Sequence, residues 1–250
     1  MASRPGPPSQ VWLAILMAAC AGFVDVACFF RLAGIFGSFM TGNSSHFAYN
    51  LSHRGSDPAR YGWALASYAL GLLFSASLEQ VQRRNGIRSS FAAILFLECI
   101  LLALYIRFSA SPSSPLWLLI FLICFSLGMQ TVTITHAGPI RVWTTFQTGN
   151  LANFAESLSA WLFWFRDRTR GRFRRRAWCA LRLTPRQMPA RHAAATAIVW
   201  SGYFSGAFAG GIGESAWGAI SLWLPIATLA AIAALDLRRP RALGEPAPKH

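Results

Sequence analysis

Runs of mostly apolar residues, each about 18 residues long or longer, constrain the fold of this chain more than any other feature. Such runs can cross the hydrocarbon core of a bilayer as helices, because a helix bonds every backbone amide within its own segment. Hydrophobic residues make up 54% of the chain and charged residues only 13%, too few to cover a soluble domain of 250 residues. The sequence therefore predicts an all-α polytopic membrane protein.

Hydropathy predicts about six transmembrane helices. They lie near residues 11–30, 61–78, 89–108, 115–134, 193–212 and 215–235. With this topology one side of the membrane receives 19 of the 23 basic residues, and only Arg31, Arg54, Arg60 and Arg107 remain for the other side. Because positively charged loops stay in the cytoplasm, both termini are expected to be cytoplasmic.

The two halves of the chain carry the same motifs in the same order. Gly22 precedes the Thr-Gly-Asn of residues 41–43 by 19 positions, and Gly128 precedes the Thr-Gly-Asn of residues 148–150 by 20. Each triplet is followed by a span with a tyrosine and small residues at matched places: Ser67, Tyr68, Gly71 and Ser75 in the first half, and Gly202, Tyr203, Gly206 and Gly210 in the second. We interpret this pattern as an internal duplication.

The duplication predicts how the chain is organised. We expect a first membrane repeat at 11–108 and a second at 109–236, with a basic cytoplasmic loop at 166–191 and disordered tails at 1–10 and 237–250. Repeats of three spans each insert with opposite orientation, which is the inverted-repeat arrangement of many secondary transporters. If residues 44–52 and 150–165 also crossed the membrane, the protein would have eight spans and parallel repeats. We expect these two segments to be short or re-entrant helices instead, because eight spans would place three arginines of the 79–88 loop outside.

The Thr-Gly-Asn triplets are the first candidates for a functional site. Thr41, Gly42 and Asn43 open one short helix, and Thr148, Gly149 and Asn150 open the other. Thr or Asn side chains cap the free amides of a helix start, and such a start attracts anionic or polar groups. The triplets either form a binding site near the midplane of the membrane or only begin helices inside a cavity.

Four further polar residues lie in or beside the apolar spans. Asp25 is expected to bind a cation, relay a proton or form an ion pair with Arg31, because a carboxylate inside a span is costly without a partner. Glu98 has the same status in the third span. Gln130 lies near the place in the second half that Asp25 occupies in the first, and His46 follows the first triplet on α-helical spacing. Each of these residues is either a binding residue or an interior hydrogen-bonding residue.

The net charge of +14 comes mostly from arginines crowded into a few loops beside the spans. That placement indicates contact with the lipid bilayer, and with anionic lipids at the basic loop, and it argues against nucleic acid as a partner. The chain has no catalytic motif such as G-x-S-x-G or H-E-x-x-H and no C-x-x-C metal spacing, so we expect neither an enzyme nor a cofactor or metal. An oligomer is compatible with the sequence.

The motifs resemble the YoaK-type family of bacterial integral membrane proteins, a domain of unknown function. The resembling residues span about 11–236 and include Gly22, Asp25, residues 39–43, residues 128–130 and residues 144–149. Thr131 departs from the family pattern, in which Asn often follows the Gln. The resemblance implies a location in the bacterial inner membrane and implies no activity.

Two kinds of function fit the sequence. A small secondary transporter or permease would use a site at the repeat interface for an ion or small molecule, and buried polar groups in both halves favour it. A membrane scaffold or sensor would use the basic loop instead.

Overall fold

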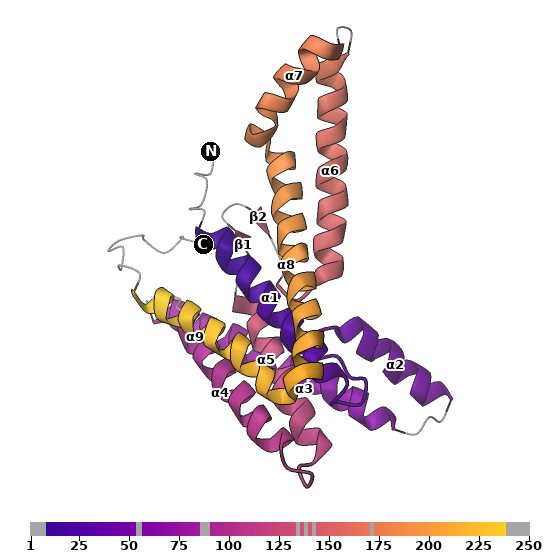
Figure 1. Cartoon of the computed structure of the whole chain (residues 1–250), viewed down its shortest axis with the longest axis vertical. Helices are drawn as coiled ribbons and strands as arrows, with labels where there is room; N and C mark the ends of the chain where they lie inside the picture. Colours follow the sequence, from indigo (N-terminus) through magenta and orange to yellow (C-terminus); the bar gives the residue numbers. More distant parts are fainter. Residues whose placement is uncertain are drawn as a thin grey trace.

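The computed structural model describes residues 9–53, 57–85, 91–133, 136–137, 140–141, 144–170 and 173–238. The regular secondary structure of this part is helical apart from a pair of two-residue strands (Figure 1). The helices are α1 (Ser9–Phe29), α2 (Met40–Ser52), α3 (Pro58–Arg84), α4 (Ala92–Ser109), α5 (Leu116–Thr133), α6 (Gln147–Thr169), α7 (Phe173–Leu183), α8 (Met188–Trp217) and α9 (Trp223–Arg238), with short 3-10 turns η1 (Thr184–Arg186) and η2 (Gly218–Leu222). Strands β1 (His136–Ala137) and β2 (Ile140–Arg141) pair antiparallel.

Five stretches of the described chain are long and apolar enough to cross a membrane. Four of them lie in α1, α3, α4 and α5, and the fifth, Met188–Arg238, covers both α8 and α9. The predicted spans near 193–212 and 215–235 fall in this last stretch, which breaks at Gly218, where φ is +61°. The fold is therefore that of a helical, membrane-spanning protein.

Helix α1 packs along α8 in the same direction, at backbone contact. A Cβ added at Gly22 would collide with the carbonyl of Tyr203, and one added at Gly206 would collide with the carbonyl of Ala19. Gly210 lies in the same way against Phe23. The predicted close approach at the small-residue row of α8 is therefore present, because only residues without a Cβ leave room for it.

Helix α3 packs along α5 in a matching way. A Cβ at Gly128 would collide with the carbonyl of Tyr68, and one at Gly71 would collide with the carbonyl of Phe125. The first span of each half therefore packs against the Tyr-containing span of the other half, through glycines at equivalent positions.

Helices α2 and α6 begin at the centre of the molecule and leave it in different directions (Figure 1). Helix α2 packs against α3, and α6 packs against α8. Both helices begin earlier than expected, at Met40 and Gln147, so each Thr-Gly-Asn triplet lies in the first turn of its helix. Helix α6 also ends later than expected, at Thr169 instead of residue 165. Neither is among the stretches apolar enough to span a membrane.

The segment 166–191, expected to be a basic loop, is mostly helical. It contains the end of α6, then α7 and η1, and the start of α8. Ala180 on α7 is fully buried, while Trp178 and Arg182 are exposed and stack with the guanidinium 5.1 Å from the ring centroid. The indole of Trp161 on α6 donates to the hydroxyl of Thr184 at 3.3 Å. This helical structure was not expected, and it forms because α7 has an apolar side that packs on α6 despite its arginines. The predicted cytoplasmic location of the segment stays a prediction.

Candidate functional site

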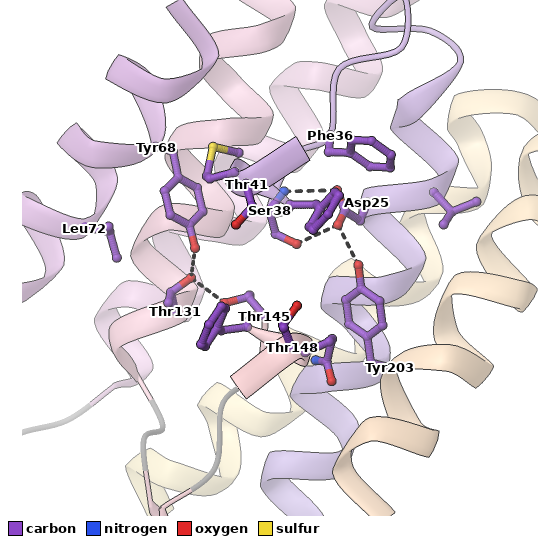
Figure 2. A pocket seen from close by; sticks show the side chains of 15 residues that line it. Asp25, Phe36, Ser38, Thr41, Tyr68, Leu72, Thr131, Thr145, Thr148 and Tyr203 are labelled. Carbon is purple, nitrogen blue, oxygen red and sulfur yellow. Dashed lines mark hydrogen bonds between the residues drawn. The ribbon is translucent and has the colours of Figure 1, made fainter. Parts of the chain in front are cut away.

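Asp25 lies in α1 with 1% of its surface exposed, and four donors surround its carboxylate. The backbone amides of Gly37 and Ser38 donate to Oδ1 at 2.7 and 3.0 Å, and the hydroxyls of Ser38 and Tyr203 donate to Oδ2, each at 2.6 Å. These four bonds fill the acceptor sites of a carboxylate. Asp25 thus holds the segment before α2 and the middle of α8 against α1 (Figure 2).

The alternative of an ion pair between Asp25 and Arg31 is not found. The Nε of Arg31 lies 2.6 Å from Oε1 of Glu214, near the end of α8. This ion pair joins the ends of α1 and α8, and it leaves Asp25 without a basic partner in the described residues.

The second half contains a matching cluster built on Thr131. Its hydroxyl lies 2.7 Å from the hydroxyl of Tyr68 and 2.8 Å from that of Thr145, and it donates to the carbonyl of Leu127 at 2.8 Å. A hydroxyl has one proton, so Tyr68 and Thr145 must be the donors to Thr131. Thr131, Thr145 and Tyr68 therefore stand where Asp25, Ser38 and Tyr203 stand in the first half.

The two asparagines of the triplets are fully buried in the first turns of α2 and α6. Asn43 accepts from the amide of Phe36 at 3.1 Å and donates to its carbonyl at 2.7 Å, which ties the incoming segment to α2. Asn150 donates to the side chain of Gln147 at 3.3 Å. The N-cap positions are Phe39 and Phe146, and neither makes a side-chain cap bond. The prediction that Thr or Asn caps these helices was therefore wrong.

A pocket of about 600 Å³ opens between the two clusters, and Figure 2 shows Asp25 and Tyr203 on one side of it with Tyr68 and Thr131 on the other. Its walls are Asp25, Val26, Phe36, Ser38, Phe39, Met40, Thr41, Tyr68, Leu72, Thr131, Thr145, Phe146, Gln147, Thr148 and Tyr203. Asp25 is the one formally charged group among them. The pocket therefore combines one carboxylate, several hydroxyls and a largely aromatic and aliphatic wall.

Three of the predicted site residues, Asp25, Thr41 and Thr148, line this pocket, whereas the other members of the triplets lie beside it. Gln130 points away from it, and its Nε2 donates to the carbonyl of Met17 at 3.2 Å. His46 is exposed on α2 and stacks on Tyr61 with ring centroids 5.3 Å apart.

Five lining residues with hydroxyl groups were not predicted as site residues: Ser38, Tyr68, Thr131, Thr145 and Tyr203. The repeated motifs contained a signal for all five of them. The two tyrosines stand at matched places, and Ser38 and Thr145 both precede a triplet by three positions. Gly22 and Gly128 align Thr131, rather than Gln130, with Asp25.

In the described residues no three His, Cys, Asp or Glu side chains gather in a way that could hold a metal ion. The five cysteines are free thiols, of which Cys179 is exposed.

Comparison with known proteins yields one match. No curated protein and no solved structure matches the chain. A family model described as a protein of unknown function, DUF1275, matches residues 13–235, which includes both Thr-Gly-Asn triplets and both clusters around the pocket. The chain therefore belongs to the DUF1275 family, in agreement with the resemblance of its motifs to the YoaK-type proteins.

Proposed function

We propose that the protein is a small membrane transporter whose substrate site is the pocket between Asp25 and Thr131. The observation that carries the proposal is that both halves supply equivalent residues to one pocket: Ser38 and Thr145, Thr41 and Thr148, and Tyr203 and Tyr68. Substrate sites at the interface of two repeats are the rule in transporters built by duplication. A scaffold has no need of a polar pocket at this place.

The directions of the helices support an inverted repeat. Gln130, near the end of α5, bonds to Met17 in the first half of α1. Cys124, in the middle of α5, donates to the carbonyl of Phe36, beyond the end of α1, at 3.8 Å. The first spans of the two halves therefore run in opposite directions, whereas parallel repeats with eight spans would make them run in the same direction.

The polar groups of the pocket favour a substrate with hydrogen-bond donors. Ser38 and Tyr203 donate their protons to Asp25, and Tyr68 and Thr145 donate theirs to Thr131. Each of these four hydroxyls therefore has only acceptor lone pairs left for a ligand. We infer a small organic molecule with donor groups and an apolar portion, which matches the aromatic wall and a volume within the usual range of ligand pockets.

The placement of the arginines supports an orientation in the bacterial inner membrane with both termini in the cytoplasm. Arg166, Arg168, Arg176, Arg182 and Arg186 are exposed on α6, α7 and η1. In this orientation they face the cytoplasmic leaflet, where each arginine near an anionic surface contributes about 1 kcal/mol. Anionic phospholipids are therefore the partner that we propose for this face.

The test of transport is access to the pocket from both sides of the membrane. Thr148 lines the pocket, and Cys179 is the exposed cysteine of the chain, so Thr148→Cys in a Cys179→Ser background places one reactive thiol there. We expect a membrane-impermeant maleimide to label this variant both in intact cells and in inside-out vesicles.

The control is the wild-type protein, whose Cys179 should react from the cytoplasmic side alone. Labelling of the introduced cysteine from a single side would contradict transport and favour a scaffold or sensor.

A further inference from the structure

Glu98 on α4 is a fully buried carboxyl group that does not belong to the pocket. Neither of its side-chain oxygens has a hydrogen-bond partner in the described part of the chain. Two thiols, those of Cys20 on α1 and Cys99 on α4, lie close enough to interact electrostatically with it. An ionised carboxylate in such surroundings is strongly disfavoured, because bulk solvent does not reach it and no basic group in the described residues offsets its charge.

Its position in the fold connects the two halves. Cys99 donates to the carbonyl of Ile226 at 3.5 Å, and Cys20 lies 4.0 Å from the carbonyl of Pro225. Glu98 therefore lies where α1 and α4 of the first half meet the start of α9 of the second half. Helices α4 and α9 also pack directly on each other. A movement of one half against the other would change the surroundings of Glu98.

We propose that Glu98 is a proton-binding site that holds its proton in the present packing and exchanges it with water when α4 and α9 separate. This deepens the proposed transport function and rests on it, because it makes the proton the coupling ion. The step transfers one proton between the Glu98 carboxylate and water and involves no oxidation or reduction. The titratable groups facing Glu98 are Cys20 from α1 and Cys99 from α4 itself, and α5, η2 and α9 add none within electrostatic reach in the described residues.

The test uses dicyclohexylcarbodiimide, an apolar reagent that adds to protonated carboxylic acids. The acid adds across one C=N bond, and the product rearranges to a stable N-acylurea that retains all atoms of both reactants. The full-length protein is reconstituted in vesicles, treated in mildly acidic and in alkaline buffer, and digested for mass spectrometry of the Glu98 peptide. We expect an adduct on Glu98 in acidic buffer and at least a several-fold lower yield in alkaline buffer, normalised to the reagent that remains.

Two variants complete the experiment. Glu98→Gln should remain folded, because the amide is neutral and of similar size, and its peptide should carry no adduct. Glu156→Gln, a change at an exposed carboxyl on α6, should leave the Glu98 labelling unchanged.

Absence of an adduct on Glu98 in both buffers would overturn the proposal, and so would an equal yield in both, which would make Glu98 a permanently neutral structural residue. Either result leaves the pocket proposal intact, since that proposal stands or falls on the accessibility of Thr148→Cys.

Discussion

Asp25 connects two parts of the chain that are far apart in sequence, since its partner Tyr203 is 178 positions away. Its four hydrogen bonds link α1 to α8 and also to the segment that precedes α2. The same side chain lines the pocket. Thr131 makes three bonds at the equivalent place and cannot carry a charge at neutral pH. The two clusters therefore place hydrogen-bonding side chains at equivalent positions, but one is built around a carboxylate and the other around a neutral hydroxyl.

Asp25→Asn should lower the free energy of unfolding by about 1–3 kcal/mol, because one side-chain atom changes from an acceptor into a donor that faces donors. The rotation of the Ser38 and Tyr203 hydroxyls limits the loss. Adding Arg31→Gln should not restore stability, since Arg31 pairs with Glu214 instead. Thermal unfolding in detergent measures these effects, with the exposed Asp167→Asn as the control. An Asp25→Asn protein as stable as the wild type would contradict the conclusion that Asp25 stabilises the packing of α1 against α8 and the segment before α2.

At this scale the sequence predicted which residue was unusual but not what it binds. Hydropathy alone identifies Asp25 as unusual, because its carboxylate lies between apolar residues inside a span. Its bond to Tyr203 depends on how α1 and α8 pack, which no local pattern specifies. Gln130 was predicted because it lies near the place in the second half that Asp25 occupies in the first, although the alignment of Gly22 with Gly128 indicates Thr131.

Helices α1 and α8, and likewise α3 and α5, touch along their backbones where glycine replaces a side chain. The small-residue rows predicted this packing, because small residues at every fourth position lie on one face of a helix. Helix α7 was missed because hydropathy detects long apolar runs and not short amphipathic helices among arginines. The early start of α6 was missed because Thr, Gly and Asn are typical of helix ends.

Two alanine substitutions on α8 test the packing of this helix directly. Gly206→Ala should destabilise the protein by about 1–3 kcal/mol, because its Cβ would collide with the carbonyl of Ala19. Gly211→Ala should be neutral or stabilising by up to about 1 kcal/mol, since its Cβ would meet only Val26 at 3.5 Å and alanine favours helix. Thermal unfolding of both variants in the same detergent measures the difference. Equal stability of the two would show that α1 and α8 do not approach so closely.

The whole molecule is organised by the exchange of helices between its halves. The first span of each half packs on the Tyr-containing span of the other half, and the third spans, α4 and α9, pack on each other. The motif order predicts a duplication, and the packing adds that the first and third spans of each half pack mainly on helices of the other half. The proposed opposite orientation of the halves has a consequence for topology.

Reporter fusions test that topology. Fusions after Asn85 and after Arg176 should report a cytoplasmic location, and a fusion after Asp57 should report a periplasmic one, because only α1 and the non-spanning α2 precede it. The activities of a cytoplasmic and a periplasmic reporter, each fused at every site, measure on which side of the membrane the site lies. A periplasmic signal after Asn85 would mean that α2 crosses the membrane and that the halves are parallel.

The difference between Asp25 and Thr131 has an energetic meaning. Two identical halves could exchange their conformations and give a mirror state of equal energy, so that each state would be occupied half of the time. Here the cluster of one half is built around a carboxylate with four donors, and the cluster of the other half is built around a hydroxyl. The two states that such an exchange would relate therefore differ in free energy. A difference of about 1.4 kcal/mol already makes one state tenfold more populated. In the proposed inverted-repeat transporter, the difference between Asp25 and Thr131 therefore favours one of the two states over the other.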